Sequence, residues 1–245
     1  MVALRLSRKK VEANRARASS CEGHDVGMRA WDDYHGCLGE AIEACSRHFG
    51  FCFLLDLHGQ SHRAGVTELG YLVTSDDLLL ADEVLDKVPP RPSSVDALLH
   101  RSEAGGSSLS AIIRGERSLG ALLELQGFRC TPSPSIPQPV ASEVLEAARQ
   151  AQADIHANSG PPSQEAAAAA TYFWGAYTIR RYGACKTVPD QFNPLSPDAQ
   201  QSWAMNVAAV QLETSWDGVR VDDVSRRRFG YGLRVAVEEF LRIWS

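Results

Sequence analysis

Histidines and a carboxylate gather at the end of an apolar segment near residue 58. Residues 51–57 read FCFLLDL, an almost unbroken apolar run that is typical of a strand covered on both faces. Asp56 lies in this run, and His58, Gly59 and His62 follow it. Parallel strands deliver their last residues to the crevice where open α/β sheets bind ligands, and an imidazole held there can ligate a metal ion. A surface turn that happens to contain histidine is the alternative.

A second apolar segment also ends on a carboxylate. Residues 207–214 read VAAVQLET, which predicts another buried strand with Glu213 near its end. Two such strands would bring His58 and Glu213 to the same edge of a sheet. This pair suits metal-assisted amide hydrolysis, because the metal activates water and the carboxylate moves its proton to the leaving amine. An ordinary strand-end residue is the alternative interpretation of Glu213.

Several arginines are candidates for binding an anion. Arg15 follows Asn14 in a polar N-terminal stretch, Arg180 and Arg181 follow an aromatic run, and Arg220 comes shortly after the second strand. A guanidinium group can hold a substrate carboxylate through two parallel hydrogen bonds. Each of these arginines, taken alone, can equally be a solvated surface charge.

The rest of the sequence predicts helices that alternate with strands, which indicates an α/β protein. One helix is predicted over residues 31–49, with acidic residues 32 and 33 in its first turn and Gly50 at its end. Residues 65–73 are predicted to contain a further strand. Helices are also predicted over residues 78–85, 95–100, 107–114, 118–125 and 225–244. Residues 140–170 are low in complexity and are interpreted as an insertion within a single domain over residues 1–245.

Composition excludes several classes of function. The chain has 245 residues, enough for one large α/β domain, and a net charge of −5 without a basic stripe, so nucleic acid is not an expected partner. Its six cysteines lack C-x-x-C spacing, which argues against a cysteine-rich zinc module and indicates reduced thiols in the cytoplasm. No apolar run is long enough to span a bilayer, so no membrane partner is expected.

Segments along nearly the whole chain resemble the N-formylglutamate amidohydrolase-like family, which is related to the zinc carboxypeptidases and aspartoacylase-type deacylases. Residues 7–15 (SRKKVEANR) are similar to the family's S-R-x-x-[VI]-D-x-N-R, and residues 55–62 (LDLHGQSH) to its D-L-H-G-H-S metal motif. Residues 172–183 (YFWGAYTIRRYG) resemble Y-F-x-G-G-Y-x-x-R-x-H-G. Further similar segments are residues 30–35, 68–71 (ELGY), 118–120, 127–128, 132–134 and 210–213 (VQLE) followed by Arg220.

The resemblance implies a fold, a cofactor and an activity. The fold would be a three-layer, phosphorylase/hydrolase-like α/β fold with a central mixed, mostly parallel sheet. The cofactor would be zinc, with His58 as a ligand and Glu213 as the catalytic general base and acid. The reaction would be hydrolysis of the amide bond of an N-acyl amino acid, a small acidic amide such as N-formylglutamate.

The remaining roles concern metal and substrate binding. His62 is the best local candidate for a second zinc ligand, and Asp56 would orient His58 through a hydrogen bond or line the pocket. By similarity, the substrate carboxylate would be held by Asn14 and Arg15, with weaker candidates in Arg180, Arg181 and Arg220.

The chain departs from the family pattern ahead of Asn14. Family members carry an H-x-G type motif with further zinc ligands upstream of the Asn-Arg pair, whereas the thirteen residues before Asn14 contain no histidine. We therefore expect the N-terminal strand and its ligands to be missing, although a catalytic zinc needs about three protein ligands. Two alternatives follow: an inactive or truncated family member that acts as a binding module, and a metallopeptidase that acts on acidic peptides.

Overall fold

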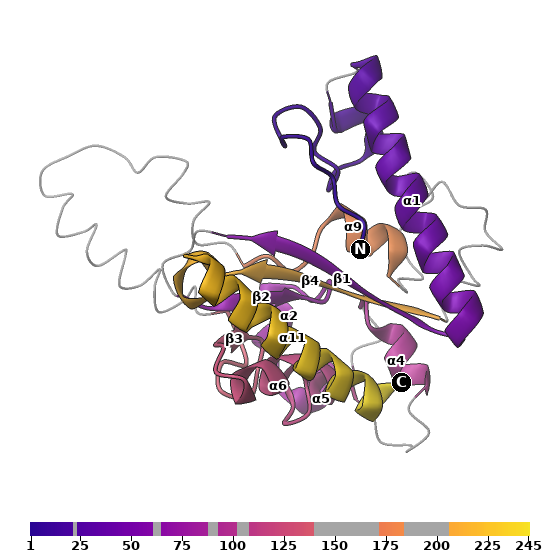
Figure 1. The fold of residues 1–245 in the computed structure, drawn as a ribbon. Helices are drawn as coiled ribbons and strands as arrows, with labels where there is room; N and C mark the ends of the chain where they lie inside the picture. Colours follow the sequence, from indigo (N-terminus) through magenta and orange to yellow (C-terminus); the bar gives the residue numbers. More distant parts are fainter. Residues whose placement is uncertain (22–23, 61–64, 88–92, 102–107, 140–171, 184–205) are drawn as a thin grey trace, which may run out of the picture.

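A mixed sheet forms the centre of the molecule (Figure 1). The computed structural model describes residues 1–21, 24–60, 65–87, 93–101, 108–139, 172–183 and 206–245. Within these ranges the sheet has four strands in the order β1 (Cys52–Gly59), β4 (Val207–Thr214), β2 (Thr67–Gly70) and β3 (Cys130–Thr131). β1 pairs in parallel with β4, and β2 with β3, whereas β2 and β4 are antiparallel. The predicted α/β class with a mixed, mostly parallel sheet is therefore confirmed.

The two long strands differ in burial. All residues of β4 are buried, as the sequence predicts. β1 lies at one end of the strand order, and most of its residues are only partly buried, with Leu57 57% exposed. The prediction that residues 51–57 form a strand is confirmed, but the prediction that this strand is covered on both faces is wrong. Among the described strands, β4 alone pairs with β1, so one edge of this apolar strand lacks a neighbour.

Helices cover both faces of the sheet. α1 (Asp25–Phe49) and α9 (Tyr177–Tyr182) lie on one face, and α11 (Asp223–Trp244) lies on the other (Figure 1). Because successive strand residues point to opposite faces, β1 contributes to both layers. Leu54 packs in a cluster with Leu38 of α1, whereas the Phe53 ring lies 5.5 Å from that of Phe240 in α11. The result is three layers: helix, sheet and helix.

The α1 helix is longer than the sequence predicts. It begins at Asp25, so Asp32 and Asp33 lie in its interior and not in its first turn. Asp32 instead pairs with Arg17, the first residue of the short helix η1 (Arg17–Ser19), at 2.6 Å. The predicted end is confirmed, since Gly50 adopts a left-handed conformation with φ of 71°.

The helix predicted over residues 78–85 is two short helices, α2 (Ser75–Leu78) and α3 (Asp82–Leu85). Thr74 caps α2 through a reciprocal pair of hydrogen bonds with Asp77, which starts that helix earlier than expected. Arg114 donates to the carbonyls of Leu78 and Leu80, at 2.7 and 2.6 Å, and so satisfies the backbone where α2 ends. The break depends on a residue distant in sequence, which local patterns do not show.

The other helices lie close to their predicted positions. They are α4 (Asp96–Arg101), α5 (Leu109–Arg114) and α6 (Leu119–Leu125). The distorted turn η3 (Trp216–Arg220) was not predicted. None of the helices in the described ranges combines the length and the apolar character that crossing a membrane requires. The insertion predicted at residues 140–170 lies outside the described residues.

Gly70 offers a test of the packing between β2 and the chain before α9. A Cβ atom at Gly70 would lie 2.8 Å from both the Gly175 nitrogen and the Phe173 oxygen, which are backbone atoms with little freedom to move. We expect Gly70→Ala to lower the free energy of unfolding by about 1–3 kcal/mol. The measurement is the midpoint of urea unfolding.

The control for this test is Gly36→Ala. Gly36 lies within α1, and a Cβ atom at this residue would have nothing within 4 Å of it. Alanine there should raise the stability by about 0.5–1 kcal/mol, because it favours the helix. Equal unfolding midpoints for the two variants would contradict the close approach at Gly70.

Candidate functional site

Three titratable side chains lie side by side across the sheet. The register of β1 and β4 places His58 opposite Glu213, and the register of β4 and β2 places Glu68 on the other side of Glu213. Residues directly opposite each other on paired strands share one face of the sheet. The expected meeting of His58 and Glu213 at one sheet edge is therefore observed, on the face that α1 and α9 cover.

The His58 ring is held between two carboxylates. Its Nε2 atom lies 3.0 Å from Asp56 Oδ1, and its Nδ1 atom lies 4.0 Å from Glu213 Oε1. Because a carboxylate accepts hydrogen bonds, the short contact places a proton on Nε2 and leaves the Nδ1 lone pair directed toward Glu213 in the neutral ring. Asp56 therefore contacts His58, and it also lines the cavity described below. The sequence offered these two positions for Asp56 as alternatives, and the structure shows both.

The environment of His58 favours its charged form. Burial by itself lowers the pKa of His58, but the hydrogen bond with Asp56 and the charges of Asp56 and Glu213 outweigh burial. The pKa of His58 therefore lies above its ordinary value of 6.5. The ring therefore keeps its proton to a higher pH than an exposed histidine does.

Glu213 is shifted in the direction that suits proton transfer. Its side chain is buried, and burial raises the pKa of Glu213 above its usual value although His58 and a hydrogen bond from Gln211 act in the opposite direction. The negative charge of Glu68 adds to the rise. A carboxyl group with a raised pKa is a better proton donor and acceptor near neutral pH than an exposed glutamate.

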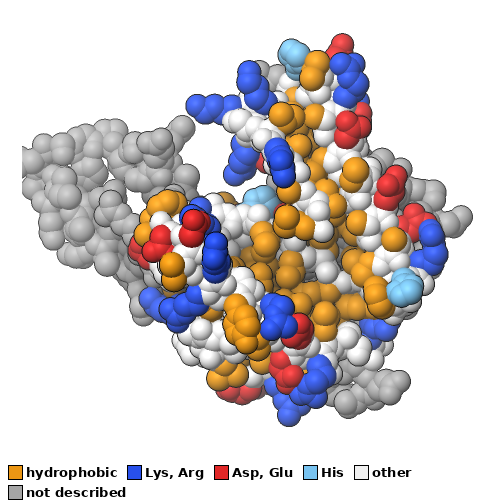
Figure 2. All heavy atoms as spheres, viewed as in Figure 1, with side chains coloured by type: hydrophobic (Ala, Val, Ile, Leu, Met, Phe, Trp, Pro, Cys, Tyr) orange, Lys and Arg blue, Asp and Glu red, His pale blue; other side chains and the backbone are white. Residues whose placement is uncertain are grey.

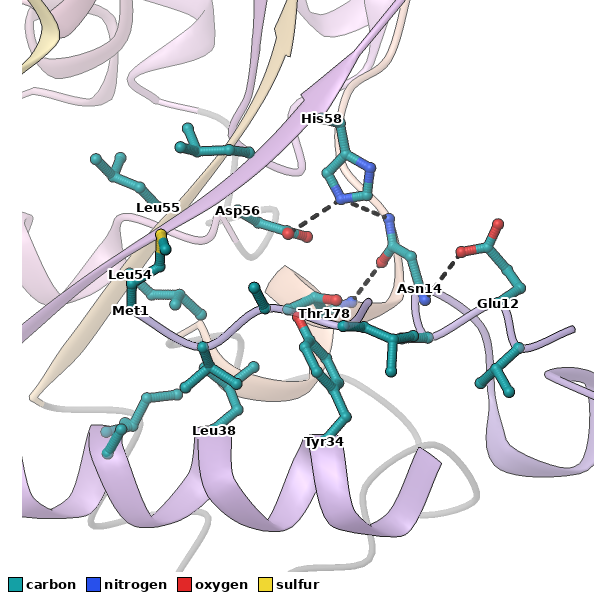
Figure 3. A pocket seen from close by; sticks show the side chains of 18 of the residues that line it. Met1, Glu12, Asn14, Tyr34, Leu38, Leu54, Leu55, Asp56, His58 and Thr178 are labelled. Carbon is teal, nitrogen blue, oxygen red and sulfur yellow. Dashed lines mark hydrogen bonds and ion pairs between the residues drawn. The ribbon is translucent and has the colours of Figure 1, made fainter. Parts of the chain in front are cut away.

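Two side-chain amides fix the arrangement around His58. Gln211 donates from Nε2 to Glu213 Oε1 at 2.8 Å and accepts from the Ala176 backbone at 2.9 Å. Asn14 accepts from the Thr178 backbone at 2.9 Å, and its Nδ2 atom lies 3.4 Å from His58 Nε2 (Figure 3). Since His58 Nε2 already donates to Asp56, Asn14 Nδ2 donates to Gln211 Oε1, at 3.5 Å, and the network ties the N-terminal segment and the start of α9 to β4.

The predicted substrate-binding arginines at positions 15, 180 and 181 make no described contact with His58. The Arg15 side chain is exposed and makes no hydrogen bond or ion pair within the described part of the chain. The Arg180 guanidinium stacks over the Trp174 ring at 4.6 Å. The Arg181 guanidinium is surrounded by aromatic rings, among them Trp31 at 5.4 Å. None of these three arginines lines the cavity described below.

Arg220 joins the ends of the two strands that carry His58 and Glu213. Its Nε atom donates to the Thr214 carbonyl at 3.1 Å, and its guanidinium also donates to the Gln60 carbonyl. A Cβ atom at Gly59 would lie 2.5 Å from the guanidinium carbon, so the glycine allows this close approach. The hydrogen bonds of Arg220 go to backbone carbonyls, so this residue links the ends of β1 and β4.

Sequence reasoning missed Glu68 and Gln211 as members of the site. Gln211 precedes Glu213 by two positions and therefore shares its face of the strand, a signal that the period of two could have revealed. Glu68 is buried and accepts from the Phe173 backbone at 2.9 Å. Its position beside Glu213 depends on the antiparallel pairing of β2 with β4, which no local pattern encodes.

The described donors fit part of a zinc site. His58 has the arrangement of many zinc-binding histidines, with one ring nitrogen held by a carboxylate and the other carrying a lone pair. Asp56 Oδ2 is buried and lacks a hydrogen-bond partner among the described residues. Within the same residues no group of three or more His, Cys, Asp or Glu is placed to hold a metal ion. His62, the other predicted ligand, lies outside the described ranges.

A cavity of about 610 Å³ opens beside His58, between β1, α1 and the N-terminal segment (Figure 3). One end is polar, with Asp56, His58 and Asn14, and the remainder is mainly apolar. The volume lies within the range of small-molecule sites.

Comparisons with models of protein families, with curated proteins and with solved structures give no match.

The contact with Asp56 can be tested through the titration of His58. We expect Asp56→Asn to lower the pKa of His58, because it removes the charge and the hydrogen-bond acceptor that raise it. The measurement is a pH titration of the ring protons by NMR.

Stability gives a second readout of the same contact. A raised folded-state pKa stabilises the protein below the unfolded pKa, and this contribution is lost as the pH rises through the folded pKa. Asp56→Asn should therefore cost more stability at about pH 5.5 than at about pH 8. The control is Asp33→Asn, at an exposed position of α1. A His58 pKa that is the same in both variants would contradict the role of Asp56.

Proposed function

We propose that this protein is a zinc-dependent amidohydrolase of the N-formylglutamate type, with a phosphorylase/hydrolase-like fold, that hydrolyses the amide bond of an N-acyl amino acid. The observation that carries the proposal is the pair His58 and Glu213 on adjacent parallel strands, with Asp56 bound to the far nitrogen of His58. The order of the motifs that resemble the family supports it.

Glu213 performs the proton transfers in the proposed reaction. Bound zinc would supply Lewis-acid chemistry, polarising the amide carbonyl and acidifying water. Gln211 occupies Oε1 of Glu213, so Oε2 is the atom that accepts the proton of the attacking water. The same carboxyl group then returns this proton to the leaving amine nitrogen. The raised pKa of Glu213 favours this second step, because the protonated form persists closer to neutral pH.

His58 and Asp56 provide the metal-binding part of the proposed site. Asp56 fixes the tautomer and the orientation of the ring, so that Nδ1 is the atom available to zinc. The described residues offer this imidazole and the neighbouring carboxylates, and His62 is our candidate for a further ligand. Asn14 lies against His58, and Arg15 is the adjacent cation that we propose for the substrate carboxylate.

A non-catalytic binding module is the second candidate function. The observation that favours it is the lack of a three-ligand cluster within the described residues. A metallopeptidase that acts on acidic peptides uses the same residues as the amidohydrolase, and a panel of peptides and small amides separates the two.

Metal content tests the proposed site directly. We expect the purified protein to contain nearly one zinc ion per chain and His58→Ala to lose it, because a tight zinc site needs about three protein ligands. The measurement is elemental analysis of folded protein. The control is His48→Ala, at an exposed position in the last turn of α1, which should retain zinc. Folded wild-type protein that takes up no zinc would favour the binding module.

Substitution of Glu213 tests the catalytic role. Glu213→Gln should lower kcat/KM for an N-acyl amino acid by about 10²–10⁴-fold, because the amide cannot take up the proton. Zinc content should stay unchanged in this variant, since the proposed metal ligand is His58. The control is Glu83→Gln, at an exposed position of α3, and the readout is the release of free amino acid. An unchanged kcat/KM in the Glu213→Gln protein would show that Glu213 is not the catalytic base.

A further inference from the structure

We propose that the cavity beside His58 binds an aliphatic acyl chain, so that the substrates are amino acids acylated with a chain of about four to eight carbons. This inference rests on the proposed function and deepens it, because it names the group on the acyl side of the amide bond. It differs from the small acidic amide that the sequence resemblance implies.

The shape of the cavity supports this assignment. The polar end holds Asp56 and His58, and from there the cavity extends along β1 toward Leu54 and toward Leu38 of α1 (Figure 3). Ile42 of α1 also lines the cavity. A volume of about 610 Å³ is much larger than a formyl group needs. An amide carbonyl placed near His58 therefore directs its acyl chain into the apolar part.

The charges around the cavity disfavour an acidic chain. Arg8 is the arginine that lines it, and its guanidinium is already paired with Glu12. Asp56 also lines the cavity, so a substrate carboxylate beside it would meet a group of like charge. The arginines predicted to bind a carboxylate, Arg15 included, lie outside it.

The apolar surface extends to the open face of the molecule. Figure 2 shows apolar side chains gathered in the hollow between α1 and α11, where β1 runs. Leu54 and Leu55 of this strand line the cavity. At the polar end, buried Asp56 Oδ2 lacks a hydrogen-bond donor among the described residues, and the N–H of an amide could provide one.

The experiment measures binding separately from hydrolysis. The probes are butanamide, hexanamide and glutaramate, which are titrated into the zinc-loaded full chain by calorimetry. We expect each buried methylene group to raise the affinity about fourfold, so that hexanamide binds about 16-fold more tightly than butanamide. Glutaramate has a carboxylate at the far end of its chain, and it should bind at least about tenfold more weakly than hexanamide.

Two variants locate the site. Ile42→Trp fills the apolar part of the cavity and should weaken hexanamide binding at least about tenfold. Val26→Trp places the same side chain at an exposed position of α1 and should leave binding unchanged. Circular dichroism checks that both variants fold, and the comparison of the three probes on the wild-type chain needs no variant. Equal binding of hexanamide and glutaramate, or no dependence on chain length, would overturn the inference.

Hydrolysis distinguishes this inference from the proposed function. Hydrolysis of an N-formyl amino acid but not of its N-hexanoyl counterpart would overturn the acyl-chain assignment and leave the amidohydrolase proposal intact. Tight hexanamide binding without hydrolysis of any amide would support the apolar site and overturn the amidohydrolase proposal.

Discussion

The parallel register between β1 and β4 is the constraint on which the site depends. It sets His58 opposite Glu213, and the alternation of side chains then places Asp56 and Gln211 on the same face, one step back along each strand. A shift of one residue in either strand would turn these side chains to the face covered by α11. Arg220 donates hydrogen bonds to backbone carbonyls at the ends of both strands, so this register is stabilised beside His58 and Glu213.

Burial and hydrogen bonding act together on the charges of the site. Glu213 is buried in the central strand, between His58 on β1 and Glu68 on β2, and burial raises its pKa. Burial alone would lower the pKa of His58, but the carboxylates of Asp56 and Glu213 keep this pKa above its ordinary value. The pKa values of His58 and Glu213 are both raised, so each group holds its proton to a higher pH than its exposed counterpart, and the two groups lie 4.0 Å apart.

The sequence predicted the parts of the fold that local patterns determine. Residues 207–214 are apolar throughout most of their length and form the fully buried β4, and Gly50 ends α1 where its left-handed conformation allows. The strand at residue 58 was also predicted, together with its meeting with Glu213. These features depend on hydrophobic periods and on single residues with strong backbone preferences.

Interactions between distant segments escaped sequence reasoning. Arg114 satisfies the carbonyls at the end of α2 and divides a predicted helix in two. Arg220 was expected to bind an anion, yet backbone carbonyls occupy it, because the distorted turn after β4 brings it to Gly59. A motif can predict that an arginine lies near a site. Whether its N–H groups bind a ligand or the protein backbone depends on the tertiary structure.

The β1 strand links the proposed chemistry to the proposed substrate. Cys52, Leu54, Asp56 and His58 all line the cavity, so one face of a single strand changes from apolar to charged along its length. A ligand that lies along this face is bound by its apolar part at one end and meets titratable groups at the other. Because the strand holds both ends rigidly, the distance between the apolar part and His58 is fixed by the rise of about 3.3 Å per residue. In the proposed reaction, the length of the acyl chain would determine how well the amide bond reaches His58, so the proposed site would select substrates by chain length.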